Sequence, residues 1–128
     1  MLLLDTCAFL WLVADQRRLS ERAKNLIRQN AADLYVSAIT AFEIGVKHRK
    51  GALSLPFSPK EWISEALEHH GIRDIPVDWE VAERSTTLPP LHRDPCDRII
   101  VATAATRGLS VLTPDRLISQ YTEVTAVW

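Results

Sequence analysis

The chain has 128 residues, of which 47% are hydrophobic and 24% are charged, and its formal net charge is −1. This length and composition are typical of one soluble globular domain with its own core, so we expect a single domain over residues 1–128. Two cysteines, Cys7 and Cys96, exclude a disulfide framework, and no apolar run reaches the ~20 residues of a membrane span.

The first part of the chain alternates short apolar runs with helical patterns. Residues 1–4 lack the basic flank and the long apolar stretch of a signal peptide, which favours a cytoplasmic protein. Leu2 to Leu4 predict a buried strand that ends at Asp5. The elements expected next are helices over 6–14 and 21–30, the second capped by Ser20, a strand over 34–36, and a helix over 39–50 that ends at Gly51.

The second part continues the same alternation. It predicts helices over 59–70, 78–87 and 97–107, strands over 72–77, 109–112 and 124–127, a polar loop over 91–96, and a turn at 113–115 followed by a short helix. Strands that alternate with helices predict an α/β fold, with a parallel sheet between two layers of helices. In such sheets, ligands bind beyond the carboxyl ends of the strands, where the strand order reverses.

Four acidic residues fall at one rim of this predicted sheet. Asp5 ends the first strand, and Asp115 follows the fourth strand. Asp97 begins the helix that leads into the fourth strand, and Glu43 lies in the first turns of the helix after the second. We therefore expect the four carboxylates to lie together, with Asp94 near them.

Four neighbouring carboxylates repel one another unless a cation neutralises them. Mg²⁺ and Mn²⁺ prefer oxygen ligands, and the sequence has no matching set of histidines and cysteines for zinc. Such a site beside a phosphodiester is the usual arrangement of a nuclease, in which the metal lowers the pKa of a water. Thr6 and Thr113 are placed to orient the carboxylates.

Each of these residues also has a purely structural interpretation. Asp97 is placed to cap its helix, an aspartate after a strand is commonly a turn residue, and both threonines are placed for local capping. Glu43 is harder to explain in this way, because an unpaired carboxylate would be costly in its apolar stretch. His92 is a possible base, but a histidine in a proline-flanked loop is more commonly at the surface.

The same residues resemble a known family. The segments Leu3–Thr6, Ser37–Ile44, His92–Ala104 and Leu112–Asp115 are similar, in order and spacing, to the motifs of PIN-domain proteins, specifically the toxins of VapBC-type toxin–antitoxin pairs. The resemblance covers nearly the whole chain. Members often carry an aromatic residue where this chain has Cys96, a departure that concerns packing of the loop.

The resemblance implies a three-layer α/β/α fold with a five-stranded parallel sheet. It implies Mg²⁺ or Mn²⁺ held by Asp5, Glu43, Asp97 and Asp115, with Asp94 as a weaker ligand or a supporting group. It also implies RNA cleavage, a homodimer, and a small antitoxin protein that covers the site. Trp11 and Trp62 are possible anchors for such partners, and ordinary core packing is the alternative for both.

Three functional hypotheses follow. The first is an endoribonuclease toxin in which Lys47, Arg93 or Arg98 holds the RNA backbone. The second is a regulatory domain that binds RNA or a protein partner without catalysis. The third is a phosphatase of small substrates, although Asp5 has no second acid two residues later, as an aspartyl-phosphate mechanism would favour.

Overall fold

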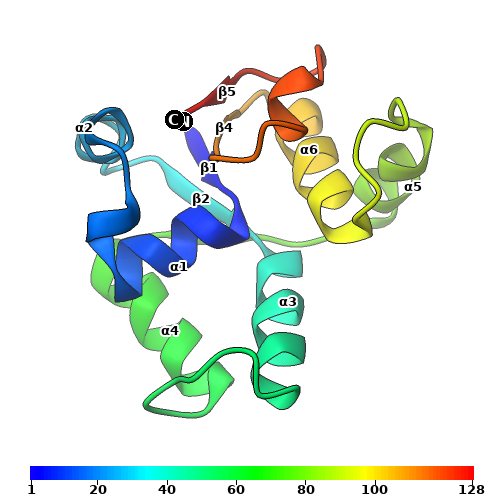
Figure 1. The fold of residues 1–128 in the computed structure, drawn as a ribbon. Helices are drawn as coiled ribbons and strands as arrows, with labels where there is room; N and C mark the ends of the chain where they lie inside the picture. The colour runs from blue at the N-terminus through cyan, green and yellow to red at the C-terminus, as the bar shows by residue number, and fades with distance from the viewer.

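A single parallel sheet forms the centre of the protein, and the computed structural model describes all residues from 1 to 128 (Figure 1). Its strand order is β3-β2-β1-β4-β5. The strands are β1 (Leu2–Leu4), β2 (Leu34–Ser37), β3 (Arg73–Ile75), β4 (Ser110–Leu112) and β5 (Ala126–Val127). All four pairings are parallel, which confirms the predicted sheet.

The central strand shows why helices cover both faces of the sheet. Leu2 and Leu4 contribute to one buried cluster, whereas Leu3, between them, contributes to the other. This alternation is the two-residue period of a strand, here apolar on both faces. The register pairs Leu4 with Val36 on one side and with Leu112 on the other, so β1 is enclosed on all sides.

The helices form the two outer layers (Figure 1). Their bounds are α1 (Thr6–Ala14), α2 (Glu21–Gln29), α3 (Ala38–Arg49), α4 (Pro59–His70), α5 (Trp79–Thr87) and α6 (Pro95–Arg107). Apolar residues of α1, α2 and α4 pack on the face that carries Leu2 and Leu4, and those of α5 and α6 pack on the opposite face. No helix combines the length and the apolar character that crossing a bilayer requires.

Helix boundaries mostly follow the capping signals in the sequence. Ser20 accepts a hydrogen bond from the Ala23 N–H at 2.9 Å, and Gly108 ends α6 in the left-handed region, with φ of 68°. Helix α6 begins at Pro95, two residues before the expected start near Asp97, so the loop predicted over 91–96 was wrong for its last two residues. Proline fits the first helical turn, so the residues assigned to a loop are the start of the helix.

The remaining differences concern short elements. The third strand covers Arg73–Ile75 and the last covers Ala126–Val127, so both are shorter than predicted. The short helix expected after the turn is a 3₁₀ helix, Ile118–Gln120, and a second one, Gln16–Arg18, was not predicted. None of these differences moves the carboxyl ends of β1 and β4. The strand order reverses between those two neighbours, because β2 and β3 extend to one side and β5 to the other.

Candidate metal centre

Asp5 lies at the reversal of strand order and is held on three sides. Its backbone N–H donates to the Leu112 carbonyl at 3.1 Å, which joins it to the end of β4. One carboxylate oxygen accepts the Ala8 N–H at 2.8 Å, and the other accepts the hydroxyl of Thr113. Asp5 is only 4% exposed. It therefore caps α1 and is also fixed in place by Thr113, as the orienting role predicted for that threonine requires.

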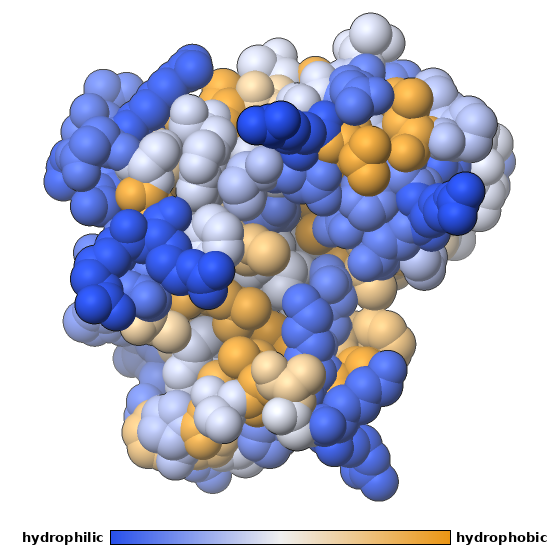
Figure 2. Space-filling model, in the orientation of Figure 1, coloured by the Kyte–Doolittle hydropathy of each residue, from blue (hydrophilic) through white to orange (hydrophobic).

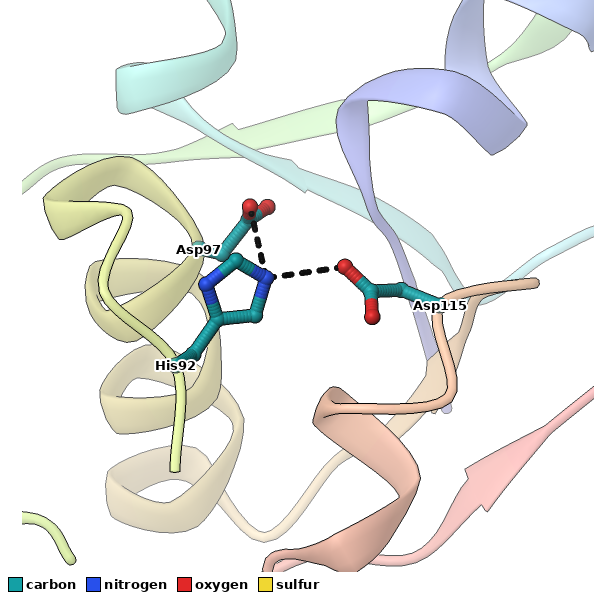
Figure 3. A group of neighbouring side chains, drawn as sticks. All are labelled: His92, Asp97 and Asp115. Carbon is teal, nitrogen blue, oxygen red and sulfur yellow. Dashed lines mark hydrogen bonds and ion pairs between the residues drawn. The ribbon is translucent and has the colours of Figure 1, made fainter. Parts of the chain in front are cut away.

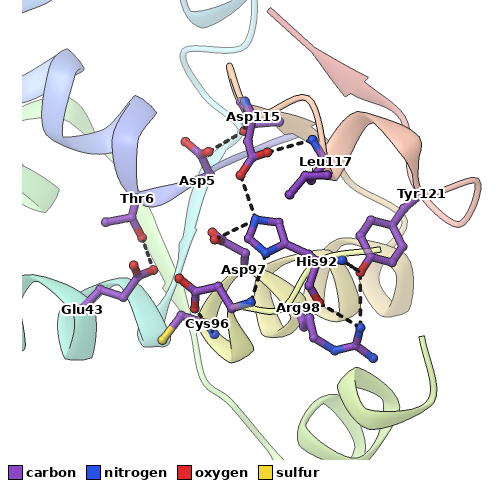
Figure 4. A network of polar contacts seen from close by, with 12 residues as sticks. Asp5, Thr6, Glu43, His92, Cys96, Asp97, Arg98, Asp115, Leu117 and Tyr121 are labelled. Atoms are coloured by element: carbon purple, nitrogen blue, oxygen red, sulfur yellow. Dashed lines mark hydrogen bonds and ion pairs between the residues drawn. The ribbon is translucent and has the colours of Figure 1, made fainter. Parts of the chain in front are cut away.

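Glu43 approaches from α3 and is held by α1. The Thr6 hydroxyl donates to Glu43 Oε1 at 2.7 Å (Figure 4). The Thr6 oxygen also lies 3.0 Å from the Thr40 hydroxyl. The stretch that carries Glu43 is apolar in sequence but only partly buried, because the adjacent Phe42 is 60% exposed. Glu43 is half-buried and paired, so Thr6 orients a carboxylate as predicted.

Asp97 does not cap its helix. The cap of α6 is Asp94, whose side chain accepts the Cys96 N–H at 2.9 Å. The alternative interpretation of Asp97 as a cap is therefore wrong. Its carboxylate lies in the first turn of α6, where it points toward His92 and the other acids (Figure 4).

Asp115 combines the two interpretations given to it. Its Oδ1 accepts the Leu117 N–H at 2.8 Å, which is the contact of a turn residue. Its own N–H donates to the Thr113 hydroxyl oxygen at 3.0 Å, and its Oδ2 faces His92. Thr113 thus contacts two of the four acids, one on each side of the strand reversal.

His92 lies inside the site, contrary to the surface position favoured from the sequence. Its Nε2 lies 2.9 Å from Asp115 Oδ2 and 3.2 Å from Asp97 Oδ2 (Figure 3). Its Nδ1 accepts the Asp94 N–H at 3.1 Å, and the side chain is 11% exposed. A histidine two residues before a helix-capping aspartate was the available signal, because that spacing lets the ring accept the N–H of the cap.

The electrostatics show an excess of negative charge. Burial raises the pKa of Asp5 to about 6, and the charges of Asp115 and Glu43 raise it further against the lowering effect of its hydrogen bonds. The pKa of Asp97 is raised to about 7. Burial is the largest cause, and the negative charges of Asp94 and Glu43 are the next largest. The four carboxylates therefore act on one another, although they lie far apart in the sequence.

Metal-free protein should lose stability as the pH rises. The folded-state pKa of Asp5, about 6, exceeds the unfolded value near 4, so its contribution is complete below pH 4 and is lost as the pH rises through 6. We expect wild-type protein in EDTA to lose on the order of 2–3 kcal/mol of unfolding free energy between pH 4 and 7, relative to Asp5→Asn. Urea denaturation across this range measures the difference, and parallel curves for the two proteins would contradict it.

Both cysteines lie in the field of these acids as free thiols. Burial raises the pKa of Cys7, and burial together with Glu43 raises that of Cys96 to about 11. Neither is therefore a ready thiolate nucleophile at neutral pH. The positive charge of Lys47 opposes this rise in both pKa values, which indicates that its ammonium group lies near the two thiols.

Arg98 is partly buried and is bonded mainly to groups of the protein itself, and its predicted role in holding the RNA backbone stays a prediction. Its guanidinium donates to the carbonyls of Ser85, Leu88, Pro89 and His92 and to the Tyr121 hydroxyl, at 2.8 to 3.3 Å. With its donors committed in this way, Arg98 fastens the loop before α6 to the protein. Arg93 on that loop is exposed, so its predicted role and that of Lys47 stay predictions.

The two tryptophans have different environments. Trp62 is 7% exposed and packs edge-on against Phe9, with ring centroids 5.9 Å apart, so the core interpretation holds for it. Trp11 is half-buried, packs against Trp128 at 5.7 Å and lies under the Arg18 guanidinium at 4.6 Å. Its predicted role as an anchor for a partner stays a prediction.

The donor set fits a hard divalent cation. The four acids offer carboxylate oxygens, which Mg²⁺ and Mn²⁺ prefer. Burial, with the charges of neighbouring acids, raises the pKa values of Asp5 and Asp97, and a bound cation would offset both effects. One donor atom from each of His92, Asp97 and Asp115 lies within 4.8 Å of the others. Neither cysteine belongs to this group, so a thiolate zinc site is not supported.

Comparisons with known proteins agree with this geometry. Residues 2–124 match the PIN domain. Ribonuclease VapC22 of Mycobacterium tuberculosis is 32% identical over 120 residues, which cover 93% of this chain and 90% of the relative. A chain in VapBC2 from Rickettsia felis, solved with a promoter DNA fragment, superposes with a TM-score of 0.74 at 12% identity over 99% of this chain and 98% of its own. A chain in FitAcB from Neisseria gonorrhoeae superposes with a TM-score of 0.70 at 26% identity, over 100% of this chain and 97% of its own. The chain therefore belongs to the PIN-domain family, as one of its VapC-type members.

Proposed function

We propose that the protein is a Mg²⁺- or Mn²⁺-dependent endoribonuclease and the toxin of a toxin–antitoxin pair. The observation that carries the proposal is the convergence of Asp5, Glu43, Asp97 and Asp115 where the strand order reverses. Membership of the PIN-domain family and likeness to a curated ribonuclease support it.

The four carboxylates would hold the cation, which supplies Lewis acidity toward a phosphate oxygen and lowers the pKa of a nearby water. The protein supplies orientation. Thr113 holds Asp5 and the backbone of Asp115, and Thr6 holds Glu43, so the acids are fixed before substrate arrives. Such preorganisation reduces the rearrangement needed in the transition state.

Lys47 is the basic residue best placed for the RNA backbone. It follows Glu43 by four residues on α3, so the two side chains lie on the same side of the helix. Its charge acts on both site thiols, which supports a position beside the acids. Arg93 follows His92 in the loop before α6 and is exposed. These two cations are proposed to position phosphate groups.

An antitoxin protein is the proposed partner. The comparison structures include a toxin–antitoxin complex from Klebsiella pneumoniae, with a TM-score of 0.69 at 22% identity over 100% of this chain and 97% of its own. Apolar side chains gather over α1, α3 and α4 on the face seen in Figure 2. A cavity of about 310 Å³, lined by residues including Leu12, Phe57 and Trp62, lies between α1 and α4. A homodimer is part of the same proposal.

Cleavage of total cellular RNA tests the proposed activity. Purified protein, free of antitoxin, should give discrete fragments with Mg²⁺, and EDTA should reduce the rate at least ~100-fold because the acids then lack their cation. Gel analysis of the fragments measures the activity and identifies the RNA. Folded protein that binds RNA without cutting it under either metal would favour the regulatory domain, and activity limited to a small phosphomonoester would favour the phosphatase.

A further inference from the structure

His92 lies between two of the four acids, Asp97 and Asp115. Its Nε2 hydrogen-bonds to Asp115 Oδ2 at 2.9 Å and lies 3.2 Å from Asp97 Oδ2 (Figure 3). These acids come from different elements, Asp97 from α6 and Asp115 from the turn after β4. The ring is the one side chain seen to bridge them (Figure 4).

The hydrogen bonds of the ring determine which nitrogen carries the proton. Nδ1 accepts the Asp94 N–H at 3.1 Å, so Nδ1 has no proton of its own. The neutral imidazole therefore carries its proton on Nε2 and directs that N–H toward the carboxylates. A histidine that ligates a metal through Nε2 needs a lone pair there and usually donates from its Nδ1–H to an acceptor. Here the partner of Nδ1 is a donor, so the ring is arranged as a hydrogen-bond donor to the acids and not as a metal ligand.

We propose that His92 takes the place of a cation between Asp97 and Asp115 in the metal-free protein, holds the two carboxylates together, and competes with a metal for that position. The proposal rests on the cation site of the proposed function. An N–H pointed at a cation is repulsive, so a cation that uses both oxygens must displace the ring from them. Any metal bound without that displacement relies on Asp5, Glu43 and the free side of Asp97.

The loop that carries His92 is built to keep the ring in place. The His92 N–H donates to the Tyr121 hydroxyl at 2.9 Å, and its carbonyl accepts from Arg98 at 3.3 Å. Both backbone groups are therefore bonded to parts of the protein outside the loop. The ring itself is nearly enclosed, at 11% exposed. These hydrogen bonds fix the backbone of His92, so the contact of its ring with the two acids does not depend on the conformation of a free loop.

Titration of metal-free full-length protein with MnCl₂, followed by calorimetry, tests the proposal. We expect His92→Ala to bind Mn²⁺ about tenfold more tightly than wild type, because the competing N–H is gone. We expect the same variant to melt at a lower temperature in EDTA, because the acids lose the donor between them. His92→Gln keeps an amide N–H and should fall between the two. His69→Ala removes an exposed histidine at the end of α4 and should bind like wild type.

The possible outcomes distinguish the proposed role of His92 from the proposed cation site. Tighter binding by His92→Ala supports the competition, which a loss of structure alone would not produce. Equal or weaker binding by that variant, with wild type still binding Mn²⁺, overturns the role of His92 and leaves the cation site standing. Absence of Mn²⁺ binding in wild type and all variants overturns both this role and the metal-dependent function.

Discussion

Asp5→Asn should reduce RNA cleavage by at least ~10³-fold while the protein stays folded. Asp5 follows the central strand directly and is 4% exposed, and the negative charges of Asp115 and Glu43 act on its carboxylate. Removal of its charge removes a carboxylate from the centre of the proposed cation site. Rate measurements under saturating Mg²⁺ with a labelled RNA fragment give the loss directly.

The same substitution should not weaken the fold. The asparagine oxygen can accept the Ala8 N–H, and its amide can donate to the Thr113 oxygen, so both contacts of Asp5 persist. Loss of a buried charge should raise the metal-free stability at pH 7, so activity and stability should change in opposite directions. Asp33→Asn, at an exposed acid 52% accessible, serves as the matched control and should change neither quantity appreciably. Full activity of Asp5→Asn would refute the assignment of the site.

The second large effect is expected at Arg98. Arg98→Ala should lower the free energy of unfolding by about 3 kcal/mol, because the substitution leaves several carbonyl groups without their charged donor. The guanidinium joins the end of α5, the loop before α6 and the Tyr121 hydroxyl, with its shortest contact, 2.8 Å, to Leu88. Urea denaturation at pH 7 measures the loss. Arg98→Lys should recover only part of it, since an ammonium group does not reproduce the planar fork.

Arg107→Ala is the matched control for Arg98. Arg107 lies in the last turn of the same helix, its side chain is 48% exposed, and its nearest acid, Asp78, is 4.0 Å away. An exposed pair of this kind contributes little to stability. If Arg98→Ala were no less stable than Arg107→Ala, the fastening role would be wrong, and the predicted role of Arg98 toward RNA would be favoured.

Local patterns in the sequence were sufficient to predict most of the elements and to place the four acids at one rim of the sheet, whereas their role in binding a cation stays a prediction. A buried run that ends at Asp5 predicts a strand and the edge of a sheet at which it stops, and the same reasoning applies to Asp115. Parallel pairing then brings the carboxyl ends of β1 and β4 together. The positions of Asp5 and Thr113 follow from topology, without knowledge of any side-chain angle.

His92 and Arg98 were misplaced for a different reason. Both belong to the segment around the start of α6, whose conformation depends on contacts with Ser85 and Tyr121, far away in the sequence. A histidine and an arginine in a polar segment give no local signal of burial. Only the packed structure shows that these polar groups find partners inside the protein.

The central place of β1 also affects how the protein is made. Its neighbours on the two sides begin at residues 34 and 110, and the last acid of the site is residue 115. A chain still emerging from the ribosome carries Asp5 from the start but has nothing to pair along one side of β1 until β4 appears. Contacts between such distant segments form late in folding. The candidate metal centre is therefore completed only once β4 and the turn that carries Asp115 are available beside β1.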